Sequence, residues 1–204
     1  MPTLKISDCI ACQTFPCEDV NPQGYLIPDL SIDPTTIKMV MISESTPLDS
    51  KAYFYAGGEA SYAQTTRQAF SQAGINVNSI QELLKSGVYF TTAIKCAKTA
   101  YRIKAATIKN CSHILETELG LFPKLKVLML MGDAAIKALN AIARRKTGKR
   151  AIPSGSTYKI RTSEYTFQDM RLFPSYLQVG PSFGIEKSKQ RMIAEDITAA
   201  MALM

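Results

Sequence analysis

The chain has 204 residues, of which 46 % are hydrophobic and 20 % charged, a composition of ordinary globular proteins rather than of disordered or membrane proteins. Its length fits a single domain over residues 1–204 and excludes a large multidomain assembly. The formal net charge is +7, yet residues 1–50 hold two basic and seven acidic side chains, so the other 154 residues carry 22 basic and 10 acidic ones. This surplus favours a polyanionic partner, because neutralised phosphates release counterions.

The chain shows no sequence signal for a membrane or for export. Residues 1–9 contain no apolar run of signal-peptide length, and the longest compact apolar stretch, residues 127–131, is too short to cross a bilayer. We therefore expect a cytoplasmic protein that does not bind a membrane, and we expect it to be a monomer.

Four short apolar or β-branched runs predict buried strands. They lie at residues 38–42, 88–94, 126–131 and 170–173. Helical patterns fall at residues 59–73, 78–85, 103–119 and 185–203, and a further helix opens at Gly132. Strands that alternate with helices predict an α/β fold with a mostly parallel sheet covered on both faces. The functional site of such a sheet lies at the carboxyl ends of its strands, which here carry Glu44, Thr92, Lys95, Gly132, Asp133, Phe173 and Ser175.

Two stretches of the chain are rich in cations and contain no acidic residue. Residues 134–163 hold eight Lys or Arg side chains, and we expect residues 144–155 to form a mobile basic loop. The second stretch carries Lys95, Lys98, Arg102, Lys104 and Lys109. It suits a clamp on a nucleic-acid backbone, and the alternative is a solvated helix face.

Five cysteines in a reducing cytoplasm point to metal binding rather than to disulfides, and an odd number cannot pair completely within one chain. Cys9 and Cys12 form a C-x2-C motif, and Cys96 and Cys111 lie fifteen residues apart. Four thiolates in this pattern suit a zinc ion or an iron-sulfur cube. Cys17 is then a spare thiol or an alternative ligand to Cys9. In the competing interpretation Cys96 is a small buried hydrophobe.

Taken together, the order and spacing of these motifs resemble the iron-sulfur uracil-DNA glycosylases, families four and five of that superfamily. The matching stretches are C-I-A-C at 9–12, I-S-E-S-T-P at 42–47, T-T-A-I-K-C at 91–96, N-C at 110–111, P-K at 123–124 leading to G-D-A-A at 132–135, and F-P-S-Y-L at 173–177. The resemblance spans nearly the whole chain. It implies a three-layer α/β/α fold with a four-stranded parallel central sheet, and a [4Fe-4S] cluster on Cys9, Cys12, Cys96 and Cys111.

The resemblance also implies that the protein flips a damaged base out of DNA and cuts its N-glycosidic bond. Glu44 takes the place of the family's loop carboxylate, which orients water and stabilises oxocarbenium charge. Its neighbours Ser43 and Ser45 are expected to contact the substrate. The aromatic run Tyr53-Phe54-Tyr55 falls where the family stacks a ring on the base, and core packing is the alternative for Phe54 and Tyr55. The remaining expected substrate contacts are Lys95, on the DNA backbone, and the wedge pair Tyr176 and Leu177.

Two departures from the family pattern concern the base pocket. The family's Thr-Asn, whose amide reads the uracil edge, is replaced by Thr91-Thr92, and a hydroxyl cannot make a bidentate amide contact. The family's His-Pro-Ser is replaced by Phe173-Pro174-Ser175, so the imidazole donor is lost, which typically costs about 10²–10³ in rate. Thr92, Phe173 and Ser175 thus occupy the family's catalytic positions. The single histidine, His113, is expected to be exposed or locally bonded.

The first hypothesis is a DNA glycosylase with altered base specificity or weak activity on uracil, acting on single- or double-stranded DNA that contains a modified base. Its cluster would be structural. The second hypothesis is a catalytically silent iron-sulfur module that binds nucleic acid. The third is a small redox or zinc protein whose positive charge is incidental.

Overall fold

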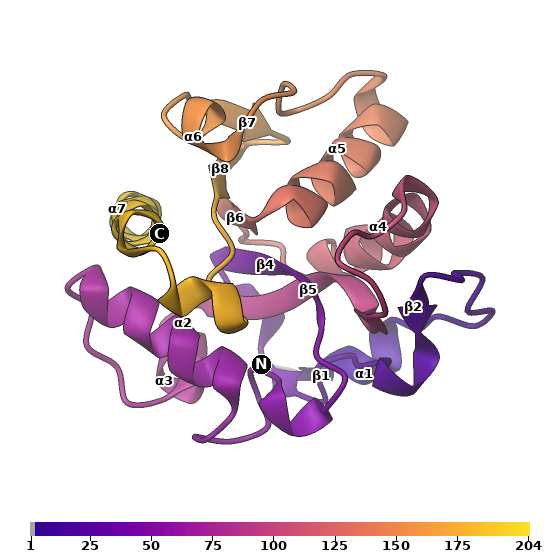
Figure 1. The fold of residues 1–204 in the computed structure, drawn as a ribbon, viewed down its shortest axis with the longest axis horizontal. Helices are drawn as coiled ribbons and strands as arrows, with labels where there is room; N and C mark the ends of the chain where they lie inside the picture. Colours follow the sequence, from indigo (N-terminus) through magenta and orange to yellow (C-terminus); the bar gives the residue numbers. More distant parts are fainter. Residues whose placement is uncertain (1–2) are drawn as a thin grey trace.

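The computed structural model describes residues 3–204, which form one six-stranded sheet between two layers of helices (Figure 1). The strand order is β2-β5-β4-β6-β8-β7. Its four central strands run parallel, and they are β5 (Val88–Lys98), β4 (Met39–Thr46), β6 (Val127–Met131) and β8 (Met170–Ser175). The predicted α/β/α fold with a four-stranded parallel centre is therefore confirmed.

Both edges of the sheet carry a short antiparallel strand that the sequence pattern did not predict. These strands are β2 (Val20–Asn21), which pairs with β5, and β7 (Tyr165–Phe167), which pairs with β8. Runs of two and three residues are too short to show an alternating pattern. A separate two-stranded ladder joins β1 (Leu4–Lys5) to β3 (Ser31–Ile32).

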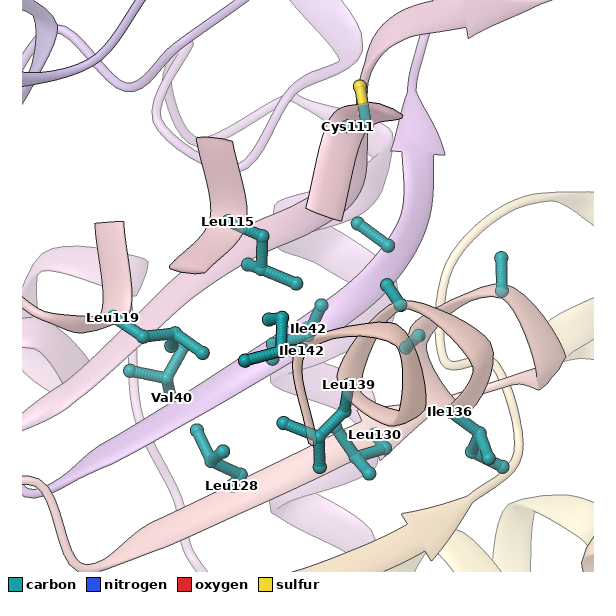
Figure 2. Close-up of a cluster of buried hydrophobic side chains, with 14 of the residues drawn as sticks. Val40, Ile42, Cys111, Leu115, Leu119, Leu128, Leu130, Ile136, Leu139 and Ile142 are labelled. Atoms are coloured by element: carbon teal, nitrogen blue, oxygen red, sulfur yellow. The ribbon is translucent and has the colours of Figure 1, made fainter. Parts of the chain in front are cut away.

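Helices α4 (Ala105–Leu119) and α5 (Asp133–Thr147) cover one face of the sheet. Figure 2 shows how side chains from both layers meet there. Alternate residues of the strands point to this face, because successive side chains of a strand project to opposite sides. The labelled strand residues are Val40, Ile42, Leu128 and Leu130, and the labelled helix residues that pack on them are Leu115, Leu119, Ile136, Leu139 and Ile142.

The residues between them, including Met39, Met41 and Met129, point to the other face. Helices α2 (Ser61–Gln72), α3 (Ile80–Lys85) and α7 (Lys187–Met201) lie on that side of the sheet (Figure 1). Each central strand is thus apolar on both faces, as is usual for parallel sheets. The remaining elements are single turns: α1 (Ile6–Cys9), α6 (Thr157–Ile160), and the 3-10 turns η1 (Pro22–Gly24), η2 (Pro34–Thr36), η3 (Ser50–Ala52) and η4 (Pro181–Gly184).

Two predicted strand ends are wrong. Strand β5 continues four residues beyond Ile94, so Lys95 and Cys96 lie inside the strand. Strand β8 does not stop before Pro174. Its ladder with β7 ends at Leu172, so beyond that point β8 has one neighbour only, and a residue without an N–H group is tolerated.

The expected mobile loop at residues 144–155 is also partly wrong. Helix α5 runs through Thr147 and ends at Gly148, whose φ of 76° forms a left-handed cap. The following residues are held by Asn140, whose side-chain oxygen accepts hydrogen bonds from the backbone N–H groups of Ala151 and Ile152 at 3.0 Å. The basic residues at the start of this stretch therefore stand on a helix. Within residues 3–204, no helix combines the length and apolar character needed to span a membrane.

Candidate active-site cleft and cysteine cluster

A cleft enclosing about 1500 Å³, including its open mouth, lies where the central strands end. Glu44 comes from β4, Lys98 from β5, Gly132 and Asp133 follow β6, and Tyr176 and Leu177 follow β8. This is the edge at which parallel sheets place their ligands. Gly132 begins α5 with a φ of 94°, and the wall passes close to it, because an added Cβ would lie 3.6 Å from Cβ of Leu177.

Glu44 supplies the carboxylate of the cleft. Its Oε2 atom is 2.9 Å from Nζ of Lys98, and the two side chains are 22 % and 35 % exposed. Tyr62 lies nearby and donates a hydrogen bond to the backbone oxygen of Ser45 at 3.2 Å. Burial, with a smaller contribution from the Glu44 charge, raises the pKa of Tyr62 to about 12. Glu44 is thus partly shielded, yet it remains open to the cleft.

The two serines beside Glu44 are buried. Ser43 donates a hydrogen bond to Oε1 of Gln178 at 3.1 Å. Thr92 pairs in register with Ser43 on the neighbouring strand and is also fully buried. Ser43, Ser45 and Thr92 therefore do not line the surface of the cleft.

The predicted stacking rings pack into the protein. Phe54 is buried, and its ring centroid lies 5.4 Å from that of Phe90. The Tyr55 hydroxyl donates to the Phe90 carbonyl at 3.1 Å and accepts from the Phe90 N–H at 2.8 Å. Burial raises the pKa of Tyr55 well above its ordinary value. Neither ring lines the cleft described here.

Phe173 and Ser175 are buried and contact other parts of the protein. Phe173 is 7 % exposed and lies under the Arg171 guanidinium, which is 5.0 Å from its ring centroid. Ser175 donates a 2.6 Å hydrogen bond to Asp196 of α7. Tyr176 and Leu177, in contrast, do line the cleft, and Nζ of Lys189 lies 5.5 Å from the Tyr176 ring centroid.

The expectation that Lys95 contacts the DNA backbone needs correction. Its side chain is fully buried, and Nζ lies 2.6 Å from Oε2 of Glu118 and 2.7 Å from Oγ1 of Thr91. Glu118 also accepts hydrogen bonds from Tyr89 and Thr91. A buried pair with these additional bonds is strongly disrupted when one partner is removed. Lys95 therefore joins β5 to α4 and is not available to a phosphate in this structure.

Cys12, Cys17, Cys96 and Cys111 line one small cavity. The loop from Cys12 to Cys17 turns tightly, with Phe15 at a φ of 43° and its ring edge-on to Tyr25 at 4.9 Å. The Tyr25 hydroxyl accepts a hydrogen bond from the Cys12 N–H at 2.8 Å. Burial, and then the neighbouring thiols, raise the pKa of Cys96 to about 12.

Cys9, the fourth predicted ligand, does not line this cavity. It is exposed, and its thiol donates to the Lys5 carbonyl at 3.4 Å. The tight Cys12–Cys17 turn brings Cys17 into the position expected for Cys9. Among residues 3–204, no three His, Cys, Asp or Glu side chains form a site for a metal ion. The four thiols line a common cavity without forming a compact group of metal ligands among the described residues.

Cations surround the cleft and continue beyond it. Lys98, Arg102, Lys137 and Lys189 line the cleft itself. An adjoining groove shares Lys137 and Asp133 with it and follows α4 and α5. The groove adds four further cations, namely Lys109, Arg144, Arg145 and Arg150. Arg145 is partly neutralised by Glu116, 2.6 Å away.

Several residues of the site carried no signal in the sequence. Tyr101 lines the cleft and is 88 % exposed, and its ring centroid is 5.8 Å from Lys98 Nζ. Gln178 follows the cleft residue Leu177 and is buried. Only the fold places them there, because neither belongs to a recognisable motif. His113, by comparison, is exposed on α4 as expected.

Known proteins share this sequence pattern. The family model described as the uracil DNA glycosylase superfamily matches residues 46–190. A type-5 uracil-DNA glycosylase of Thermus thermophilus is 36 % identical over 55 residues, which are 27 % of this chain and 25 % of that protein, so the match covers about a quarter of the relative's length. Since the family model covers more than half of the chain, and the fold agrees with it, the chain belongs to the uracil DNA glycosylase superfamily.

Proposed function

We propose that the protein is a DNA N-glycosylase that hydrolyses the bond between deoxyribose and a deaminated base. The observation that carries the proposal is the Glu44 carboxylate at the strand ends, in a cleft whose rim is cationic. A polyanionic strand is attracted to such a rim, and a carboxylate within it suits the positive charge that develops on the sugar.

Glu44 would act on the water that attacks the sugar. The water oxygen bonds to C1′, the N-glycosidic bond breaks, and its electron pair leaves with the base nitrogen. The carboxylate orients the water and takes up its proton, while its charge stabilises the oxocarbenium-like transition state. Lys98 pairs with Glu44 at 2.9 Å in the free protein, and a DNA phosphate that draws Lys98 away would leave the carboxylate free for this role.

Substitution of Glu44 tests this proposal. Glu44→Gln is expected to lower single-turnover release of uracil, hypoxanthine or xanthine by about 10²-fold, with little loss of DNA binding. The matched control is Glu164→Gln, because Glu164 is 89 % exposed and away from the cleft. Release of abasic product by Glu44→Gln at the control's rate would remove Glu44 from the mechanism.

We further propose that Cys12, Cys17, Cys96 and Cys111 hold a [4Fe-4S] cluster. Each thiolate of such a cluster binds a different iron, so the sulfurs stand farther apart than four ligands of one zinc ion. Four thiols from the N-terminal loop, β5 and α4 around one cavity support this proposal. When bound, the cluster would supply a rigid link. Its ligands would join the N-terminal loop, β5 and α4, and would brace the segment that carries Tyr101 and Arg102 to the cleft.

Two cysteine variants separate the ligand sets. Purified Cys17→Ser is expected to lose iron and acid-labile sulfide, whereas Cys9→Ser is expected to keep the wild-type content of both. The reverse result would restore Cys9 as the ligand. Zinc in place of iron in the wild-type protein would contradict the cluster.

One observation favours a second candidate, a silent module that binds DNA. Phe173 replaces a donor of the family, and its ring is packed against Arg171 in the core, so it offers no hydrogen bond to a departing base. Retained affinity for DNA with no base released from any modified oligonucleotide would favour this candidate over the glycosylase.

A further inference from the structure

Three buried polar atoms behind the cleft wall make no hydrogen bond of ordinary geometry within the part of the chain that the structure describes. They are the Tyr53 hydroxyl, the Thr92 hydroxyl and the Gln178 Nε2 atom. Each belongs to a side chain that is 2 % exposed or less. Unpaired buried polar groups are rare in proteins and cost stability, so a group of them calls for an explanation.

These atoms belong to one cluster. Gln178 accepts a hydrogen bond from Ser43, and Ser43 is the register neighbour of Thr92. The Tyr53 hydroxyl lies beside the hydroxyls of Thr91 and Thr92, which partly offset the burial that raises the pKa of Tyr53. We refer to Ser43, Tyr53, Thr92 and Gln178 as the buried polar cluster.

Two members of the buried polar cluster are chain neighbours of residues that line the cleft. Ser43 precedes Glu44, and Gln178 follows Leu177, and both Glu44 and Leu177 line the cleft. Phe54, whose ring is 5.2 Å from that of Tyr53, lies on the same side of the sheet. Because these groups are all buried in the free protein, a flat ring that enters between Glu44 and Leu177 would reach the Phe54 ring and the unpaired polar atoms only by displacing the side chains that cover them.

The hydrogen bond from Ser43 determines what Gln178 can read. Oε1 has a partner in this bond, whereas the Nε2 amide, which only donates, has none. A donor can form a hydrogen bond with a carbonyl oxygen of a base. It cannot form one with an exocyclic amino group, because that group also donates. The hydroxyls of Tyr53 and Thr92 accept from a ring N–H as well as donate. The buried polar cluster thus complements a base edge that presents a carbonyl oxygen beside a ring N–H, O=C–N–H.

Resting on the proposed function, we infer that Gln178, held by Ser43, is the residue that selects a deaminated base over its amino parent. Uracil and hypoxanthine present a carbonyl where cytosine and adenine present an amino group. Gln178 would then supply from the loop after β8 the amide that position 92 on β5 lacks. Sites that pair a specific polar group discriminate strongly, because the wrong substrate leaves the protein group unpaired.

The test uses the full-length protein and labelled oligonucleotides that differ in one base, uracil against cytosine and hypoxanthine against adenine. Fluorescence anisotropy gives the affinity ratio within each pair, and chromatography gives the released base. We expect Gln178→Leu to reduce the preference for the deaminated base about 10- to 100-fold, with overall affinity for DNA retained. Gln72→Leu is the matched control, because Gln72 is an exposed amide on α2 that binds Gln190.

The outcomes separate this inference from the proposed function. An unchanged preference in Gln178→Leu overturns the inference and leaves the glycosylase standing. A wild-type preference in binding that Gln178→Leu loses supports the inference even when no base is released, which would refute catalysis alone. A wild-type protein with no preference in either pair overturns the inference, and the glycosylase is then judged by base release alone.

A second variant covers the case in which Gln178→Leu does not fold. Thr92→Val keeps the shape of the side chain and removes only the unpaired hydroxyl. It is expected to fold and to lower the preference about tenfold. A folded Thr92→Val protein with wild-type preference in both oligonucleotide pairs would contradict the role of the buried polar cluster in selecting the base.

Discussion

At the scale of single residues, the two positions at which this chain departs from the family pattern are both buried. Thr92 is buried beside Ser43, and Phe173 fills the apolar layer under Arg171. The sequence identified these two positions because a motif marks them. It did not identify Gln178, and it left Cys17 open as an alternative ligand to Cys9, because both positions depend on how a loop folds back, and loop conformation leaves little periodic signal.

Thr92→Val tests whether the buried polar cluster is maintained for function rather than for stability. Removing an unpaired buried hydroxyl is expected to raise the free energy of unfolding by about 1 kcal/mol. The same change should reduce the rate of base release. Urea unfolding and single-turnover kinetics measure the two effects, and lower stability with unchanged release would instead give Thr92 a structural role.

At the scale of elements, the sequence predicted the four central strands and the helices around them, because apolar periodicity reports burial on two faces. The sequence did not predict the edge strands β2 and β7, because they are too short to show an alternating pattern. The role of β2 is nevertheless clear from contacts: Asp19, next to β2, accepts hydrogen bonds from the Lys104 N–H at 2.6 Å and from the Thr107 hydroxyl at the start of α4. This joins the N-terminal segment that carries Cys17 to the helix that carries Cys111.

Asp19→Asn is expected to destabilise the protein by about 1 kcal/mol at neutral pH, the usual magnitude for a capping interaction. Burial acts to raise the pKa of Asp19, but the bonds from Thr107 and the Lys104 backbone prevail and lower it below its ordinary value. A lowered pKa stabilises the fold above the unfolded-state value, and this contribution is lost as the pH falls through the folded-state value. The difference between variant and wild type should therefore shrink below about pH 4. A difference that stays constant from neutral to acidic pH in thermal unfolding would contradict this assignment.

At the scale of the whole molecule, many of the positively charged side chains line two adjoining hollows. The cleft and the groove along α4 and α5 form one cationic path that Lys137 and Asp133 share. The sequence located the charge surplus after residue 50, but only the fold shows that Arg102, Lys137 and Arg150 border adjoining hollows. The expectation for Lys95 failed because charge along a sequence does not report burial.

Salt dependence of DNA binding tests this path. Lys137→Ala and Arg102→Ala should each weaken binding at all sequences and reduce the slope of log K against log salt by about 1. Lys85→Ala, at the end of α3 and outside both hollows, is the control and should leave the slope unchanged. Equal slopes for all three variants would place the DNA elsewhere on the surface.

Release of a free base from DNA is the most direct measurement of the central claim. Wild-type protein incubated with oligonucleotides containing uracil, hypoxanthine or xanthine is expected to release at least one of these bases and leave an abasic site, while Glu44→Gln releases it far more slowly. An iron-loaded, folded wild-type protein that binds all three oligonucleotides and leaves every N-glycosidic bond intact would contradict the account.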